Sequence, residues 1–446
     1  MKINTITIVG GGSAGWMSAA YLSRKNPNVK ITLVDKEHGT PVSVGEATIL
    51  TFRTFMTECG FSIDEWFNEI DATFKSGILF TGWTENSDVW HPFYNNPDIG
   101  DCTLCDAWLN SSRKDFSIHA LPFLKDSVEN VINTDYLDAY AFHMDCSKLT
   151  EYIKSKLNIN YVQSDVVFFD GERLGLKNGD VIESDLYVDC SGFRTILKRP
   201  EKVTLEGRLF CDTAIAGHIE YVNQEVEQRP FVISDMVDHG WVWHIPVQSR
   251  IGTGLVFNRS VTDVEEATNY FKEYWNGRLG ETKVLDWTPY YSKNIWEGKV
   301  VSIGLSAGFI EPLESTGIAL ITEGLRRFQN HISMRYWTED DVVSYNMSMA
   351  NVFEDAIDFV SMHYSRPWKD TKFWRYVKEN YKESPKIRAI RKVLKKELLY
   401  SDNYKNTGLF SGANWATWMI QLGYEVNTKV DMSLEDADII IDNFTV

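Results

Sequence analysis

A glycine-rich turn near the start of the chain constrains its fold more than any other feature. Its spacing is G-x-G-x-x-G, and it lies between an apolar run at residues 3–9 and a stretch of helical periodicity at residues 13–25. Glycines allow the tight turn and let the backbone approach a pyrophosphate at the positive end of the helix. The turn residues that we expect to contact a dinucleotide are Gly10, Gly12, Ser13, Ala14 and Gly15.

A second predicted strand, residues 30–35, completes a βαβ unit. It ends in Asp35, which lies 20 residues beyond Gly15, where a carboxylate can hold a ribose hydroxyl. Together these features predict an α/β fold with a dinucleotide site. No second fingerprint of this kind occurs later in the sequence, so FAD fits better than a resident nicotinamide cofactor.

The remaining elements are interleaved with this unit. A helix is expected near 148–158 and a strand at 159–168, followed by a hairpin in which Asn178-Gly179 favours a type I′ turn. Further strands are expected at 185–190, 214–221, 240–247 and 252–257, and helices at 318–335, 339–364, 370–381 and 384–399. We therefore expect a core with an interleaved substrate sheet over residues 1–335 and a helical part over residues 336–446.

Composition excludes several classes of partner. The net charge of −17 opposes binding to nucleic acid and to an anionic membrane surface. No apolar window is long enough to span a membrane, and the first residues lack the pattern of a secretory signal, so we expect a cytoplasmic protein. The six cysteines are scattered, and Cys102-x-x-Cys105 has no second pair or histidines beside it, so no metal is expected.

Two tryptophans mark the predicted strand at residues 240–247. Trp241 and Trp243 are one residue apart and therefore point to the same face of a strand, which Pro246 closes because it lacks a backbone donor. Such a pair also packs in ordinary cores. The alternative is a flat wall that separates or holds a ligand.

A third glycine-containing segment, residues 304–317, has two interpretations. Gly304-x-Ser306-x-Gly308 matches the nucleophile elbow of α/β hydrolases, which requires a strand, a turn and then a helix. Pro312 follows before a helix can form. The better interpretation is a nucleotide-binding turn that leads into a helix starting near Gly317, whose free N–H groups favour an anion.

These segments together resemble flavin-dependent halogenases of the tryptophan halogenase type. The resemblance runs from residue 5 to about residue 425 and rests on several runs in family order. They are the glycine-rich turn, the strap Ser43–Thr48, the Lys75 segment Ala72–Phe80, Trp90–Phe93, Phe142-His143-x-Asp145, Asp185–Arg194, the W-x-W-x-I-P run and Glu311–Gly317.

The resemblance implies a fold and a reaction. The fold is a Rossmann-type FAD-binding core like that of the GR2/PHBH flavoproteins, and the cofactor is FAD, used as FADH2 that a separate flavin reductase supplies. The enzyme uses FADH2, O2 and a chloride, bromide or iodide ion to make hypohalous acid. Hypohalous acid then halogenates a small electron-rich aromatic substrate of the indole or phenol type. A flavin-dependent aromatic hydroxylase is the alternative enzyme, and a flavin-binding protein without turnover is a third hypothesis.

The resemblance also assigns roles to residues. Lys75, which has apolar neighbours in the sequence, and Glu314 are the expected catalytic pair. Further FAD contacts are expected from Gly45, Glu46, Ala47, Asp189, Gly304, Gly317 and Ile318, and halide contacts from Thr316 and Gly317. Substrate contacts are expected from His91, Pro92, Phe93, Ser315, Phe410 and Asn414, and Trp241 and Trp243 form the partition.

The chain departs from the family in its last third. It is shorter than tryptophan halogenases, and the region from about 384 to 410 is compressed. In those relatives this region holds the amino-acid end of free tryptophan. The substrate is therefore left open between free tryptophan and another aromatic.

Overall fold

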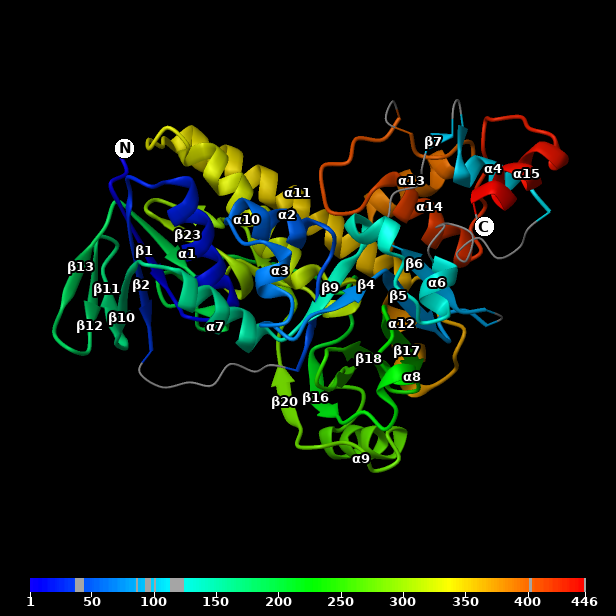
Figure 1. Ribbon diagram of the computed structural model, residues 1–446, viewed down its shortest axis with the longest axis horizontal. Coiled ribbons are helices and arrows are strands. Elements are labelled where there is room, and N and C mark those ends of the chain that lie inside the picture. Colours follow the sequence, from blue (N-terminus) through cyan, green and yellow to red (C-terminus); the bar gives the residue numbers. More distant parts are fainter. Residues whose placement is uncertain are drawn as a thin grey trace. The chain divides into compact units, whose positions relative to one another are not determined.

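The computed structural model describes residues 1–36, 44–85, 87–92, 98–99, 102–112, 124–400 and 403–444. The chain forms two compact units, each built from three separate segments. The first unit comprises residues 1–72, 144–205 and 288–353, and the second comprises residues 73–143, 206–287 and 354–446. Figure 1 labels their elements along the chain.

The unit boundaries differ from the division that we expected at residue 335. The last boundary lies within α11 (Glu339–His363). The first half of this helix packs on the first unit, where Phe353 stacks on Tyr291 with ring centroids 5.4 Å apart. The division at 335 follows secondary-structure content and remains a proposal.

A mainly parallel sheet forms the centre of the first unit. Its strand order is β10-β2-β1-β14-β23-β22, in which only β22 runs antiparallel to its neighbour. The strands are β1 (Thr5–Val9), β2 (Lys30–Asp35), β10 (Asn160–Gln163), β14 (Leu186–Asp189), β22 (Trp296–Glu297) and β23 (Val300–Ser302). The carboxyl ends of β1, β14 and β23 therefore meet at one edge, which confirms the α/β prediction.

Helices and a small sheet cover the parallel sheet. Helix α1 (Ser13–Lys25) packs against α7 (Cys146–Lys156) and α10 (Thr316–Ile332). The small sheet consists of β11 (Val166–Phe169), β12 (Arg173–Leu176) and β13 (Val181–Glu183), and its apolar side chains pack against Val9, Val34 and Tyr187. Shorter helices are α2 (Thr51–Glu58) and α3 (Ile63–Trp66). A second small sheet contains β15 (Lys202–Thr204), β21 (Tyr290–Ser292) and β24 (Gly308–Phe309).

The hairpin at Asn178-Gly179 is present, but its turn is not type I′. That turn requires a positive φ at both central residues. Gly179 has φ 92°, whereas Asn178 is not among the described residues with positive φ. The Gly179 N–H donates to the Leu176 carbonyl at 3.0 Å, so the loop is longer than two residues and Gly179 alone takes the left-handed conformation.

A seven-stranded sheet organises the second unit. Its order is β20-β16-β19-β18-β17-β5-β6. The strands are β5 (Gly77–Thr81), β6 (Val89–Pro92), β16 (Thr213–Ile219), β17 (Val232–Val237), β18 (Gly240–Pro246), β19 (Ile251–Phe257) and β20 (Lys283–Asp286). On one face, Val242, Leu255 and Phe257 pack on α9 (Val264–Tyr274).

The remaining helices of the second unit come mainly from the end of the chain. They are α4 (Leu104–Asn110), α6 (Leu124–Val128), α8 (Gln224–Glu227), α12 (Lys372–Asn380), α13 (Pro385–Leu394), α14 (Gly412–Gln421) and α15 (Leu434–Phe444). The predicted helix at 384–399 is confirmed but ends at Leu394. No helix among the described residues is both long and apolar enough to cross a membrane.

Candidate active site

The glycine-rich turn of the first unit has no room for a side chain at two of its positions, Gly10 and Gly15. Gly10 has φ 115°, and a Cβ there would lie 2.4 Å from the Cys190 carbonyl oxygen. A Cβ on Gly15 would lie 1.8 Å from the Gly10 carbonyl oxygen. Gly12 precedes α1 and faces open space, since nothing lies within 4 Å of a Cβ built there. This exposed backbone at a helix N-terminus fits a pyrophosphate.

Asp35 closes the same turn from the end of β2. Its Oδ1 accepts hydrogen bonds from the Gly11 N–H at 3.1 Å and the Lys36 N–H at 2.9 Å. The other carboxylate oxygen accepts no hydrogen bond from the described residues and remains available to a ribose hydroxyl. The expected pairing of Asp35 with the turn is therefore present.

Two further loops meet the glycine-rich turn at the same sheet edge. The buried Asp189 carboxylate accepts from Ser191 N–H at 2.9 Å and Leu197 N–H at 3.1 Å, so it holds its own loop. Burial raises the pKa of Asp189 despite these bonds. Gly304 has φ 73°, and a Cβ there would lie 2.8 Å from the Ala14 Cβ. The three loops together fit one dinucleotide.

The strap residues Gly45, Glu46 and Ala47 lie beside the start of α1. Burial and, secondly, the Glu46 carboxylate raise the pKa of the Cys146 thiol, whereas Ser13 at the start of α1 lowers it. Gly45 has φ 85°. The structure thus brings the strap and the glycine-rich turn together within the first unit.

The segment before α10 forms a candidate anion site. Ser315 has φ 57° and precedes the helix, which begins at Thr316. The Thr316 hydroxyl is buried and has no partner among the described residues, and nothing lies within 4 Å of a Cβ built on Gly317. Glu314 is fully buried immediately before this turn, and Ile318 is buried within the first turn of the helix. Helix N–H groups beside a buried hydroxyl suit a halide.

The hydrolase interpretation of Gly304-x-Ser306-x-Gly308 is wrong. Strand β24 follows this turn, so the required strand, turn and helix are not formed. The Ser306 hydroxyl is buried within hydrogen-bonding distance of the Asp189 and Ile303 carbonyls, to which its single proton can be donated. It therefore serves to join two loops and is not an exposed nucleophile.

The tryptophan wall, Trp241 and Trp243, lies in the second unit on the sheet face opposite α9. The two rings are 6.2 Å apart, and both are buried. Gly254 lies opposite Trp243 on β19, and a Cβ there would lie 2.1 Å from Cη2 of the indole. The glycine therefore lets the indole lie over the neighbouring strand.

His91 lies on the same sheet face as the tryptophan wall. It pairs with Ile78, and the alternation along β5 and β17 places it in the set that includes Phe80, Ser234 and Trp243. Pro92 follows His91 and points to the other face, so the two do not flank one ligand together. Phe93 lies outside the described residues.

Asn414 and Phe410 approach His91 from the C-terminal segment. The Asn414 amide nitrogen donates to His91 Nε2 at 2.9 Å, while its oxygen accepts from Ser411 at the start of α14. Phe410 stacks on Phe359 at 3.8 Å, and its ring centroid is 6.3 Å from that of His91. The predicted substrate residues His91, Phe410 and Asn414 thus form one aromatic and polar cluster.

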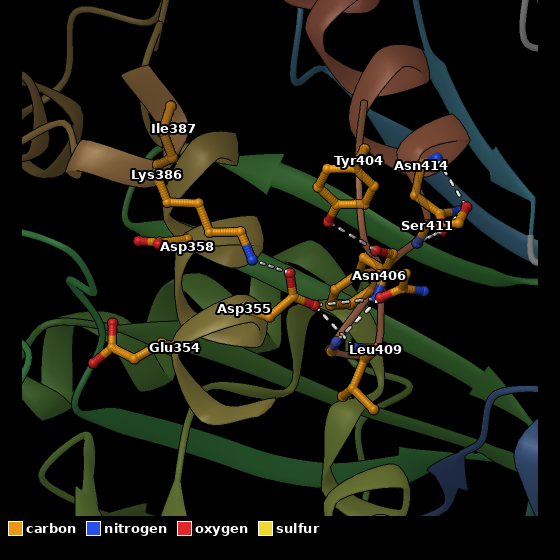
Figure 2. Close-up of polar contacts among 12 residues, drawn as sticks. Glu354, Asp355, Asp358, Lys386, Ile387, Tyr404, Asn406, Leu409, Ser411 and Asn414 are labelled. Carbon is orange, nitrogen blue, oxygen red and sulfur yellow. Dashed lines mark hydrogen bonds and ion pairs between the residues drawn. The ribbon is translucent and has the colours of Figure 1, made fainter. Parts of the chain in front are cut away.

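A buried carboxylate holds the loop that carries Phe410. Asp355 on α11 pairs with Lys386 through one oxygen and accepts from the Leu409 and Phe410 N–H groups through the other, at 2.8 and 3.2 Å (Figure 2). A Cβ on Gly408 would lie 2.1 Å from Asp355 Oδ2. The sequence did not identify Asp355 or Gly408, because their partners are distant in the chain.

Lys75 ends the short strand β4 (Thr73–Lys75) and is completely buried. Strand β4 pairs with β9 (Ala141–Met144), which places Thr73 opposite His143. The Thr73 hydroxyl donates to the Pro246 carbonyl at 2.6 Å. The strand that carries Lys75 is therefore attached to the end of the strand that carries the tryptophan wall.

The chain is similar to known proteins over most of its length. The model of the family described as tryptophan halogenase matches residues 5–436. The tryptophan 7-halogenase of Lentzea aerocolonigenes is 30% identical over 421 residues, which cover 85% of this chain and 79% of that protein. The tryptophan 6-halogenase of Streptomyces albogriseolus is 29% identical over the same shares of both chains.

A solved structure shows the same fold. The flavin-dependent halogenase from Xanthomonas campestris superimposes with a TM-score of 0.91 at 26% sequence identity, covering 100% of this chain and 94% of that one.

Proposed function

Because the chain belongs to the tryptophan halogenase family, whose model matches residues 5–436, we propose how its two units share the work of a flavin-dependent halogenase. The enzyme uses FADH2 and a halide to halogenate an aromatic substrate, and the family does not favour the hydroxylase alternative. The observation that carries the proposal is the common sheet face of Trp241, Trp243 and His91.

The first unit binds the cofactor and the halide. The backbone at Gly12 and the Asp35 carboxylate hold the dinucleotide, with the strap at Gly45–Ala47 and the loop at Gly304 beside it. Reduced FAD with O2 supplies the oxidising equivalents that convert a halide into hypohalous acid. The Thr316 hydroxyl and the N–H groups of Thr316 and Gly317 hold the halide.

The second unit keeps the substrate from being hydroxylated and then directs the oxidant, hypohalous acid, to the substrate. The tryptophan wall keeps the aromatic substrate away from the flavin and so prevents hydroxylation. Lys75 polarises hypohalous acid through its ammonium group or is converted by it to a haloamine. The haloamine forms when the neutral amine displaces hydroxide from the halogen, and the amine proton and hydroxide leave as water. The aromatic ring then attacks the halogen.

Glu314 stabilises the cationic ring intermediate and accepts the proton that the ring loses. Its complete burial and its place next to the candidate anion site support this role.

The substrate is an electron-rich aromatic of the indole or phenol class that binds against His91 and Phe410. The named relatives in Lentzea and Streptomyces are tryptophan halogenases, so free tryptophan is the first compound to compare with simpler indoles. Ser315 and Asn414 are the polar residues proposed to orient it. We place the enzyme in the cytoplasm. We also propose that a separate flavin reductase supplies FADH2, because the sequence carries a single dinucleotide fingerprint.

Lys75→Ala tests the proposed reaction. We expect aryl halogenation to fall below detection while FADH2 oxidation continues and hypohalous acid escapes, because the oxidant forms in the first unit. Products from an aromatic panel with chloride, bromide or iodide are measured by mass spectrometry. Lys148→Ala, which changes a half-exposed lysine paired with Asp71, is the matched control. Halogenation retained in Lys75→Ala would refute the role of Lys75.

A further inference from the structure

His143 belongs to the motif Phe142-His143-x-Asp145, which the reaction described above does not use. Asp145 has a structural explanation, since its carboxylate accepts from the Ser147 and Lys148 N–H groups at the start of α7. Among the residues that the structure describes, only one ring nitrogen of His143, Nδ1, has a partner, the Thr73 hydroxyl, so the other nitrogen is left without an explanation. His143 is completely buried in β9, where a histidine needs a reason to replace an apolar residue.

The strand register brings His143 to the side of Lys75. Lys75 lies opposite Ala141, and Thr73 lies opposite His143, so all four side chains share one face of the β4–β9 pair. His143 is the diagonal neighbour of Lys75, within reach of a long side chain. Ala141 is small and leaves space directly opposite the lysine.

The hydrogen bonds around Thr73 fix the tautomer of His143. The Thr73 hydroxyl has one proton and donates it to the Pro246 carbonyl at 2.6 Å. His143 Nδ1 lies 2.7 Å from the same hydroxyl oxygen, so Nδ1 must carry the proton and donate it. His143 Nε2 is then a bare lone pair, and this buried atom has no partner among the described residues.

The surroundings keep His143 uncharged. Burial, and secondly the positive charge of Lys75, hold the pKa of His143 well below its usual value. The imidazole is therefore neutral when the enzyme works, and it presents a negative lone pair in the neighbourhood of an ammonium group. A protonated imidazole would repel that group instead.

We propose that His143 is a positioning residue for Lys75. Thr73 and Pro246 hold the Nδ1–H imidazole in place, and its Nε2 lone pair, which has no partner in the part of the chain that the structure describes, becomes the hydrogen-bond acceptor that orients the lysine ammonium toward hypohalous acid during the reaction. The inference rests on the proposed role of Lys75 and extends it to the residues that make the lysine effective. Thr73, which ties Lys75 to the tryptophan-bearing strand through Pro246, belongs to the same arrangement.

Two substitutions of His143 separate its two nitrogens. Asparagine places an N–H near Nδ1 but removes the acceptor at Nε2, whereas glutamine places an acceptor near Nε2. We expect His143→Asn to lower kcat for aryl halogenation about tenfold or more, the usual effect of losing a hydrogen bond to a charged group. His143→Gln retains more activity than His143→Asn, and Thr73→Val lowers kcat because it releases Nδ1.

Three readouts distinguish positioning from general damage. The KM for the aromatic substrate and the rate of FADH2 oxidation stay unchanged in His143→Asn, while hypohalous acid captured by a scavenger in solution rises as aryl product falls. His239→Asn is the matched control, since His239 also faces a threonine hydroxyl, Thr262, at 3.4 Å. We expect it to behave as the unmodified enzyme.

A measurement without turnover covers the case in which the variants fold poorly. Nitrogen-15 chemical shifts of His143 in the unmodified protein report the proton on Nδ1 and the bare lone pair on Nε2. A proton on Nε2 overturns the proposal. The proposal also fails if His143→Asn converts the oxidant into aryl product as efficiently as the unmodified enzyme while Lys75→Ala has lost halogenation. If Lys75→Ala still halogenates, it is the proposed function of Lys75 that fails, and the chemical shifts still decide the tautomer.

Discussion

A single glycine determines how Trp243 lies in the second unit. A Cβ on Gly254 would be 2.1 Å from the indole, a separation that forces the ring to rotate or the strands to move apart. The interior of a sheet face does not absorb such a change without cost. The indole orientation is therefore set by its neighbour as much as by the tryptophan itself.

We predict that Gly254→Ala weakens the tryptophan wall. The displaced ring should lower the free energy of unfolding by about 1–3 kcal/mol and let the substrate reach the flavin, so that hydroxylated product appears beside halogenated product. Mass spectrometry gives the ratio of the two products. Gly217→Ala serves as the control, because Gly217 lies on the other face of the same sheet. An unchanged product ratio would argue against the partition role.

At the scale of elements, α11 holds the loop that completes the substrate cluster. Asp355 accepts two backbone N–H groups of the loop and pairs with Lys386, and Phe410 and Asn414 follow directly along the chain. The cluster around His91 thus depends on a carboxylate that holds the backbone of its loop, as the contact of Asp355 with Leu409 shows (Figure 2).

We predict that Asp355→Ala releases this loop. Two N–H groups lose their acceptor and Lys386 loses its partner, so the free energy of unfolding should fall by about 2–4 kcal/mol. The KM for the aromatic substrate should rise while FADH2 oxidation is unchanged, as steady-state kinetics can show. Glu354→Gln changes the adjacent residue, which pairs with Arg208, and should leave KM unchanged. An unchanged KM in Asp355→Ala would show that this loop does not contribute to substrate binding.

Local patterns predicted the elements better than they predicted the contacts. The helix at 13–25 and the strand at 30–35 agree with α1 and β2, because apolar periodicity and the glycine turn mark both ends. The hydrogen bonds of Thr73 and Asn414 were not predictable in the same way, although Asn414 was expected as a substrate contact. Their hydrogen-bond partners His143 and His91 are 70 and 323 residues away along the chain, and no sequence pattern encodes that separation.

At the scale of the whole molecule, the chain alternates between the two units. It passes from one to the other after residues 72, 143, 205, 287 and 353, so neither unit is a continuous segment. Thr73 and His143 are the first and last residues of one segment of the second unit, and their hydrogen bond joins its two ends. The arrangement that orients Lys75 therefore also closes a segment of the fold.

The loss of stability in acid follows from two histidines of the second unit whose pKa values are lowered. Burial lowers the pKa of His244 to about 3, and that of His143 also lies well below its usual value. The unfolded chain therefore takes up protons first, and stability is lost as the pH falls from about 6.5 toward 3, by up to about 1.4 kcal/mol per pH unit for each histidine.

We predict that His244→Gln reduces this loss. The Tyr274 hydroxyl donates to Asp235 at 2.9 Å, so His244 Nε2, 2.8 Å from that hydroxyl, must donate, and a glutamine amide can replace it without a titrating group. Chemical denaturation at pH 7 and pH 5 should show a smaller difference in the free energy of unfolding for the variant than for the unmodified protein. His218→Gln, at a half-exposed position, should leave the difference unchanged. An equal loss in His244→Gln would mean that His244 is already protonated in the folded protein.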